Sequence, residues 1–397
     1  MRRRFVMSNA LLVLEDGRAF RGRRFGATTD ALGEVVFNTS MMGYQEILSD
    51  PSYAAQMVVM TYPMIGNCGI APEDFEARKP FLAGLIVKEP SRIASNWRHE
   101  RHLDGYLSDH AVPGLCDLDT RALVRHLRDR GSMRGIIANA DAAQGAIEAL
   151  RARAGAAPSM AGQDLARVVS ENRTYKWERP SFDVARVPDA ARLSAGPSTR
   201  NFRVVAYDLG IKRNILRRLV DIGARVTVVP ATTSAADVLA LKPDGVVFSN
   251  GPGDPEPVDY GITAMRSLLG RVPILGICLG YQLLALAVGG RTFKMKFGHH
   301  GGNHPVMDLT TRKVEITSHN HGFAVDPESL PDARVQLTHI DLNDQALEGL
   351  RLRDVPAFGV QYHPEAAPGP HDAGYLFERF ASMMVDWRAP GADGERR

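Results

Sequence analysis

A cysteine stands midway between two glycines in the stretch "GICLGYQ" (276–282), and a thiol in that setting is a candidate nucleophile. The apolar run "VPIL" before it predicts a short buried strand, and "YQLLALAV" after it predicts a helix. Cys278 therefore falls at a strand-to-helix corner, where Gly276 and Gly280 leave room for a sharply bent backbone. A helix that begins after Cys278 points its amides at the sulfur, which favours the thiolate and supplies donors for an oxyanion. A buried core thiol is the alternative, but that alternative explains neither glycine.

A nucleophilic thiol needs a base, and the base needs an orienting group. Both are present in "GVQYHPE" (359–365), where an apolar run delivers His363 at a predicted strand end. Glu365 follows two positions later, so an extended chain would place both side chains on one face. One imidazole nitrogen could then take the thiol proton while the carboxylate holds the other nitrogen. Alone the segment is also typical of a surface turn, but with Cys278 it predicts a Cys-His-Glu triad.

The second half of the chain alternates predicted strands and helices, beginning with "RVVAYDL", "KRNILRRLVDIG" and "RVTVVPA". This rhythm predicts an α/β fold with an open, mainly parallel sheet and helices on both faces. Ligands bind such sheets at the carboxyl ends of the strands, where Cys278 lies. The turn "SNGPGDP" (249–255) follows another strand, and Gly251 and Gly253 leave its backbone amides free to face a ligand. A plain tight turn is the alternative for this segment.

The first half differs, because its strand-like runs are punctuated by glycines and followed by helices near "LDTRALVRHLRDRG". It predicts a smaller α+β domain, separated from the second by a stretch rich in Pro, Ala, Gly and Ser. The predicted organisation is an N-terminal domain over 9–185, a linker over 186–201, a second domain over 202–388 and a disordered tail over 389–397. Residues 1–8 are interpreted as a ragged extension.

Composition limits the class of protein. The chain has 397 residues, of which 44% are hydrophobic and 23% charged, and a formal net charge of +3. These values predict a folded protein without a nucleic-acid-binding stripe or a membrane-binding face. The uncharged run 272–290 is nearly long enough to span a bilayer, but its Pro and Gly residues predict a strand, a corner and a helix instead. Three scattered cysteines without Cys-x-x-Cys spacing favour a reducing cytoplasm.

Taken together, "GICLGYQ", "SNGPGDP" and "QYHPE" resemble the three signatures of the class I, triad-type glutamine amidotransferases. Further segments narrow the resemblance to the small, glutamine-hydrolysing subunits of carbamoyl phosphate synthetases: "MKFGHHGGNHPV", "SHNHGFAV", "YDLGIKRNILR", "FNTSMMGYQEILSDPSYAAQ" and "DLDTRAL". The resemblance covers roughly residues 10–387. It includes the first domain, which most other amidotransferases of this class lack.

The resemblance implies a role for each matching residue. Cys278 is implied as nucleophile, His363 as base and then acid, Glu365 as the orienting carboxylate, and the amides of Gly251 and Leu279 as the oxyanion hole. The implied glutamine-binding residues come from both domains: Ser52, Gly251, Gly253, Leu279, Gln282, Asn320, Gly322 and Phe323.

Two departures from the family pattern concern possible accessory groups. Tyr281 replaces the usual histidine, and a phenol does not titrate near neutrality, so an accessory role for this position is in doubt. Cys68 and Cys116 lack nearby base motifs and are expected to be core thiols.

A group of histidines invites a metal interpretation: His299, His300, His304, His319 and His321. The group is broken by glycines and matches family loops that bind no metal, so no metal site is expected on this chain.

The sequence also lacks the ATP-binding loop that the implied reaction would need on this chain. Carbamoyl phosphate synthesis uses glutamine, bicarbonate, water and two ATP, yet no Gly-Lys dipeptide occurs, so a Walker A loop is absent. The resemblance implies that the partner is a large subunit, with ATP and its metal ion bound there, and no cofactor on this chain. Ammonia passes from the small subunit to this partner. Neither nucleic acid nor membrane is expected as a partner.

Two other classes of function stay open. One is a different enzyme, either an amidotransferase that serves another synthase or a cysteine peptidase. The other is a silent regulatory or scaffold subunit, against which the complete set of triad residues argues.

Overall fold

The computed structural model describes residues 8–139, 144–182 and 200–387. Most of the predicted linker, the predicted tail and residues 1–7 of the extension lie outside the described residues. The chain folds into two compact units. The first comprises 1–163, 295–302 and 367–369, and the second comprises 164–294, 303–366 and 370–397.

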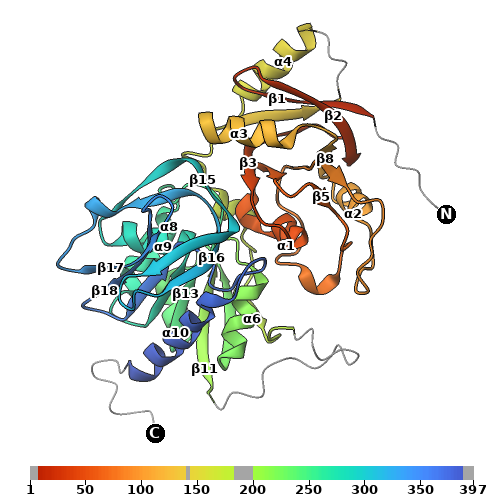
Figure 1. Ribbon diagram of the computed structural model, residues 1–397. Helices are drawn as coiled ribbons and strands as arrows, with labels where there is room; N and C mark the ends of the chain where they lie inside the picture. The colour runs from red at the N-terminus through yellow and green to blue at the C-terminus, as the bar shows by residue number, and fades with distance from the viewer. Residues whose placement is uncertain (1–7, 140–143, 183–199, 388–397) are drawn as a thin grey trace. The chain divides into compact units, whose positions relative to one another are not determined.

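The first unit is built around a closed seven-stranded barrel, which the predicted α+β class did not anticipate (Figure 1). Its order is β1 (Asn9–Leu14), β2 (Ala19–Gly26), β8 (Pro113–Cys116), β6 (Gly84–Ile86), β4 (Gln56–Met60), β3 (Ala31–Asn38) and β9 (Met133–Ala138). β1 closes the barrel by pairing antiparallel with β9. Successive residues of β4 enter two different apolar clusters, Met57 and Val59 one and Val58 and Met60 the other, so both faces of this strand are buried.

Helices cover parts of this unit. They are α1 (Tyr44–Ser49), α2 (Leu103–Asp109), α3 (Thr120–Arg130) and α4 (Gln144–Gly155), and the short strands β5 (Met64–Ile65) and β7 (Glu89–Pro90) form a separate pair. α3 lies where "LDTRALVRHLRDRG" predicts a helix. It begins after Asp119, whose side chain accepts a hydrogen bond from the amide of Ala122, and it ends at Gly131, which has a φ of 101°.

The second unit contains a ten-stranded sheet with a parallel centre. Five strands run parallel in the order β12 (Ala224–Pro230), β11 (Phe202–Asp208), β13 (Gly245–Phe248), β14 (Ile274–Ile277) and β19 (Ala357–Val360). The sheet continues beyond β19 through β18 (Leu347–Leu352), β17 (Val335–Asp341), β15 (Arg291–Asp308) and β16 (Val314–Asp326), and beyond β12 through β10 (Tyr175–Trp177).

The prediction of a mainly parallel sheet is therefore correct only for the centre. β10 pairs antiparallel with β12, and the pairs β19–β18, β18–β17 and β17–β15 are antiparallel. The reason is connection length, because a few residues join β18 to β19 and a parallel crossover needs a dozen or more. β10 also adds to this sheet a segment that the sequence places before the linker.

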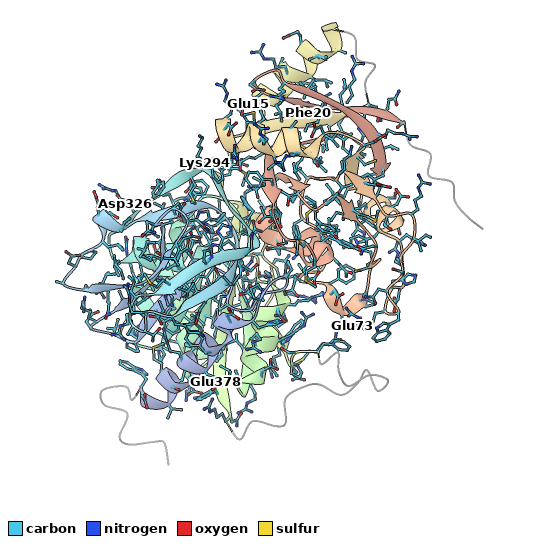
Figure 2. The ribbon with its side chains drawn as sticks, in the orientation of Figure 1. Glu15, Phe20, Glu73, Lys294, Asp326 and Glu378 are labelled. Atoms are coloured by element: carbon cyan, nitrogen blue, oxygen red, sulfur yellow. The ribbon has the colours of Figure 1, made fainter. Side chains whose placement is uncertain are left out.

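Helices pack on both faces of the sheet, as predicted. Residues of α7 (Ala235–Ala240), α8 (Asp259–Leu268) and α9 (Leu279–Ala287) enter one apolar cluster, and those of α6 (Arg213–Asp221) and α10 (Tyr375–Asp386) enter another. α10 buries Phe377 and Phe380 while Glu378 is exposed, as the labelled side chain in Figure 2 shows. The remaining helix, α5 (Leu165–Val169), precedes β10.

The uncharged run 272–290 folds as the sequence predicts, with strand β14 followed directly by helix α9. In the part of the chain that the structure describes, no helix combines the length and apolarity needed to cross a bilayer.

A strained corner joins β14 to α9. Cys278 is the single residue between them, and its φ of 52° and ψ of −104° are rarely adopted by a residue with a side chain. The flanking glycines are required sterically. A Cβ at Gly276 would lie 2.6 Å from the carbonyl oxygen of Gly280, and a Cβ at Gly280 would overlap the backbone of Phe248 on β13. The corner is possible because glycines at 276 and 280 let the backbones of β13, β14 and α9 approach more closely than residues with side chains would allow.

The corner gives a stability prediction. Gly280→Ala should lower the free energy of unfolding by about 2 kcal/mol, because the new methyl group forces β13 and α9 apart. The matched control is Gly105→Ala in α2, where no atom lies within 4 Å of the added Cβ and the change should be neutral or stabilising by about 1 kcal/mol. Urea unfolding measures both, and equal midpoints for the two variants would refute the close packing at the corner.

Candidate active site

The thiol of Cys278 is buried and contacts polar groups. Its residue is 2% exposed, and its Sγ lies 3.7 Å from the carbonyl oxygen of Asn320 on β16. The side-chain amide of Gln361 donates to the sulfur at 3.6 Å. α9 begins at the next residue, so Cys278 lies at the N-terminus of this helix, as the sequence predicts.

His363 and Glu365 come together just beyond the end of β19. Nδ1 of His363 lies 2.7 Å from Oε1 of Glu365, and both side chains are buried. The expected extended chain is wrong here, since residues 363–366 form a turn in which the amide of Ala366 donates to the carbonyl of His363. The turn brings the two side chains together by folding back instead of by strand alternation.

His363 and Glu365 shift each other's pKa. Burial alone would raise the pKa of Glu365, but Lys212 and His363 lower it to about 2. Burial alone would lower the pKa of His363, but the carboxylate of Glu365 and the interaction with the thiol of Cys278 raise it to about 10, against an opposing effect of Lys212. The carboxylate is therefore ionised at neutral pH, and the imidazole has a high proton affinity.

The triad is not fully closed. Among the described residues, Nε2 of His363 has no hydrogen-bond partner of good geometry. Catalytic hydrogen bonds are often long in enzymes without substrate.

Lys212 and Asn214 are neighbours of the triad that the sequence analysis missed. Nζ of Lys212 lies 3.0 Å from Oε1 of Glu365 and also donates to the carbonyl of Ala366. The side-chain amide of Asn214, on α6, donates to the carbonyl of Glu365. Both residues belong to the segment "YDLGIKRNILR", so the signal was present in the sequence, but only as a family likeness.

The turn after β13 carries the glycines predicted to face a ligand. A Cβ at Gly251 would lie 2.7 Å from a side-chain carbon of Leu279, so these two residues are close. Gly253 has a φ of 83°, which favours glycine. The side chain of Asn250 accepts a hydrogen bond from the amide of Lys212 at 3.0 Å. The turn is thus tied to both the corner and the start of α6.

The remaining predicted ligand-binding residues lie on α9 and β16 in the second unit, except Ser52. The side-chain amide of Gln282 donates to the carbonyl of Phe323 at 2.8 Å and to Oε1 of Gln361 at 2.9 Å. Asn320 and Gly322 lie on the same strand as Phe323. Ser52 belongs to the first unit, where it is buried in a short 3-10 helix and its amide donates to Asp50.

Tyr281 is fully buried, and its hydroxyl donates to the carbonyl of Leu347 at 3.2 Å. Burial raises the pKa of this phenol well above its usual value. The tyrosine therefore cannot exchange a proton with the thiol near neutral pH, in agreement with the doubt raised by the sequence.

Three side chains of types that often bind metals lie close together in the second unit: His319, His321 and Glu348. Nδ1 of His319 lies 3.2 Å from Nε2 of His321, and both rings lie within 4 Å of the Glu348 carboxylate. Nδ1 of His321 donates to the carbonyl of Phe323, which also accepts from Gln282. These contacts give His321 a structural use beside the predicted pocket. That the chain binds no metal stays a prediction.

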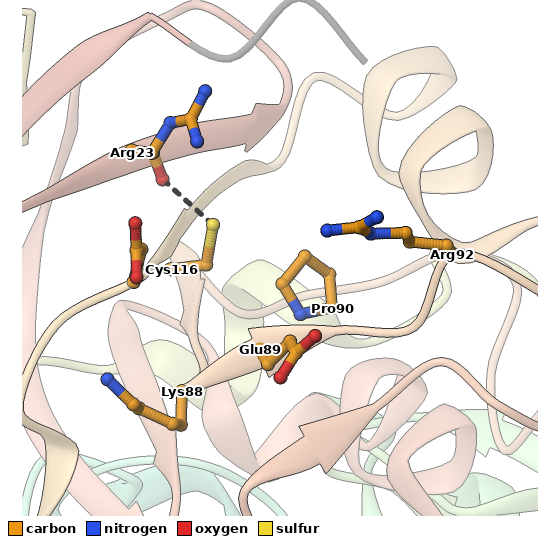
Figure 3. A pocket seen from close by; sticks show the side chains of 7 residues that line it. Arg23, Lys88, Glu89, Pro90, Arg92 and Cys116 are labelled. Atoms are coloured by element: carbon orange, nitrogen blue, oxygen red, sulfur yellow. Dashed lines mark hydrogen bonds between the residues drawn. The ribbon is translucent and has the colours of Figure 1, made fainter. Parts of the chain in front are cut away.

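The other two cysteines differ from each other. Cys116 is buried as expected, and its Sγ donates to the carbonyl of Arg23. Burial raises the pKa of its thiol to about 12, so it is a poor nucleophile, although it borders a pocket of about 450 Å³ in the first unit (Figure 3). The expectation that Cys68 is also a core thiol is wrong, because this residue is exposed. Its segment has the glycines and turns of a surface loop, which the sequence argument did not weigh.

Two separate stretches of the chain match known families. Residues 205–383 match the family described as Glutamine amidotransferase class-I, and residues 12–137 match Carbamoyl-phosphate synthase small chain, CPSase domain. Among solved structures, a Thermoplasma acidophilum protein assigned to GMP synthase is 22% identical with a TM-score of 0.41, covering 46% of this chain and 94% of that chain.

Curated relatives match over nearly their whole length. The carbamoyl phosphate synthase small chain of Syntrophotalea carbinolica is 56% identical over 375 residues, covering 94% of this chain and 97% of the relative. The small chain of Ralstonia nicotianae is 52% identical, covering 95% and 97%, and that of Escherichia coli K12 is 51% identical, covering 96% and 99%. With both family matches and these identities, the chain belongs to the family of carbamoyl phosphate synthase small chains.

Proposed function

We propose that this chain hydrolyses the side-chain amide of L-glutamine through a Cys278-His363-Glu365 triad and passes the ammonia to a large synthetase subunit. The large subunit then makes carbamoyl phosphate from bicarbonate and two ATP, for pyrimidine and arginine biosynthesis. The observation that carries the proposal is a buried thiol on a strained corner after β14 and, after the neighbouring parallel strand β19, an imidazole that a buried carboxylate holds at 2.7 Å.

Each residue of the triad has one task. His363 takes the thiol proton at Nε2, and the sulfur of Cys278 bonds to the amide carbon of glutamine. The resulting oxyanion accepts hydrogen bonds from the amides of Gly251 and Leu279, and each such donor contributes about 10²- to 10³-fold to the rate. The carbon–nitrogen bond then breaks as His363 returns the proton to the departing ammonia. Water cleaves the γ-glutamyl thioester, with the same imidazole as base, and glutamate leaves.

Glutamine binding is assigned to groups around the thiol. The side chain of Gln282 donates a hydrogen bond to the carbonyl of Phe323, which connects α9 to β16 before substrate arrives. Further contacts come from Gly253, Asn320 and Gly322, and from Ser52 of the first unit.

The proposal places the phosphorylation chemistry on the partner. ATP and its metal ion bind to the large subunit, and this chain carries no cofactor. The three cysteines are free thiols in the structure, which supports a reducing, cytoplasmic location.

The first prediction concerns the nucleophile. Cys278→Ser should abolish glutamine-dependent synthesis in the complex with the large subunit, because a hydroxyl is far harder to ionise than a thiol. Synthesis from added ammonia should persist, which shows that the complex still assembles. Carbamoyl phosphate formation from glutamine at the wild-type rate would exclude Cys278 as the nucleophile. The control is Cys68→Ser, an exposed thiol whose loss should change neither activity.

The second prediction concerns control by the partner. Because Nε2 of His363 lacks a well-oriented partner among the described residues, the isolated chain should hydrolyse glutamine roughly 10²-fold more slowly than the complex supplied with bicarbonate and ATP. Steady-state glutamate release, with and without the large subunit, measures this. Equal turnover in all conditions would mean that the triad is competent by itself.

A further inference from the structure

A second cation shares the carboxylate that orients the candidate base. Oε1 of Glu365 lies 2.7 Å from Nδ1 of His363 and 3.0 Å from Nζ of Lys212. The side chain of Glu365 is fully buried and that of Lys212 is 2% exposed. Burying an ammonium group is costly even when it is paired, and an orienting carboxylate needs only the imidazole as partner. The presence of the lysine therefore requires a separate explanation.

Lys212 is also fixed from the other side. Its side chain donates to the carbonyl of Ala366, and its own amide donates to the side chain of Asn250 in the turn predicted to form the oxyanion hole. The ammonium group is thus held at one point relative to Glu365.

We propose that Lys212 is a positioning residue that shares the Glu365 carboxylate with His363, so that the imidazole is basic enough to take the thiol proton yet acidic enough to return it to ammonia. This inference rests on the proposed function. Lys212 touches neither substrate nor thiol in this account and acts only through Glu365.

The physical argument is one of charge balance. Beside burial, the described groups with the largest effects on the pKa of the His363 imidazole are Glu365, Lys212 and Cys278. Glu365 raises the pKa of the imidazole and Lys212 lowers it. A base with too high a pKa holds its proton, and ammonia then leaves slowly. The lysine also helps to keep the pKa of Glu365 low, so the carboxylate stays ionised in both steps.

Loss of the Lys212 charge should move the pH profile of glutamine hydrolysis in one direction. Loss of the positive charge raises the pKa of His363, because one opposing influence on the imidazolium disappears. If neutral imidazole is the base, the acid limb of glutaminase activity moves to higher pH. If the imidazolium paired with thiolate is the active form, the alkaline limb moves to higher pH. In either case the profile moves upward.

The test uses Lys212→Gln in the complex with the large subunit. Glutamine removes the charge but keeps a donor that can reach the carbonyl of Ala366. The measurement is kcat/KM for glutamine hydrolysis from about pH 6 to 12, a range that brackets the His363 pKa of about 10 and an upward move of about one unit. We expect the profile to move upward by about one pH unit, since a charge at this distance shifts a pKa by about 1–3 units.

Two matched variants separate charge from structure. Asn214→Ala removes an uncharged hydrogen bond to the same turn, at the carbonyl of Glu365, and should leave the midpoint of the profile at the wild-type pH. Lys212→Arg keeps the charge and should restore the wild-type midpoint. If Lys212→Gln does not fold by circular dichroism, Lys212→Met, which retains the shape of the aliphatic stem, takes its place.

Two outcomes would overturn the inference. One is an unshifted profile in the neutral lysine variants, and the other is an equal shift in Asn214→Ala. The wild-type complex distinguishes this failure from failure of the proposed function. If wild-type protein hydrolyses glutamine and Cys278→Ser does not, the function stands and only the role of Lys212 is rejected.

Discussion

The buried carboxylate of Glu365 is the constraint on which the rest of the site depends. An isolated carboxylate in an apolar interior is costly, so the fold must bring positive or hydrogen-bonding partners to it. His363 arrives through the turn after β19, and Lys212 arrives from the residue just before α6. Two segments far apart in the sequence are therefore fixed relative to each other by one side chain. Because the central strands are parallel, their carboxyl ends meet at one edge, which makes this convergence possible.

Backbone strain at Cys278 is the second constraint, and it serves the same end. A residue with φ of 52° persists only when its surroundings fix it, and here the close contacts of Gly276 and Gly280 do so. The corner holds the thiol at the beginning of α9, where the helix amides can stabilise negative charge. The strain and the buried carboxylate thus act on neighbouring groups, one on the nucleophile and the other on its base.

Much of this site could be predicted from the sequence, because its strongest signals are local. The corner around Cys278 was visible in its flanking glycines. The sequence also indicated that His363 and Glu365 pair, but through an extended chain and not through the turn that brings them together. The part that could not be predicted depends on contacts between distant segments. Neither the contact of Lys212 with Glu365 nor that of Gln361 with the sulfur has a local signature.

The fold shows the same division. The alternation of strands and helices predicted the parallel centre and the helices on both faces. Closure of the first unit into a barrel depends on β1 pairing with β9, and the antiparallel part of the second sheet depends on which edge β18 joins. Pairings of this kind are decided by packing, which periodicity does not reveal.

The most direct test of Cys278 as the nucleophile is to look for the covalent intermediate itself. The complex with the large subunit is mixed with glutamine, quenched in acid within its first turnovers, digested and analysed by mass spectrometry. We expect a γ-glutamyl group on the peptide that contains Cys278 and on no other cysteine peptide. Steady glutamine hydrolysis with Cys278 unmodified at every quench time, or with the group on Cys68, would contradict it.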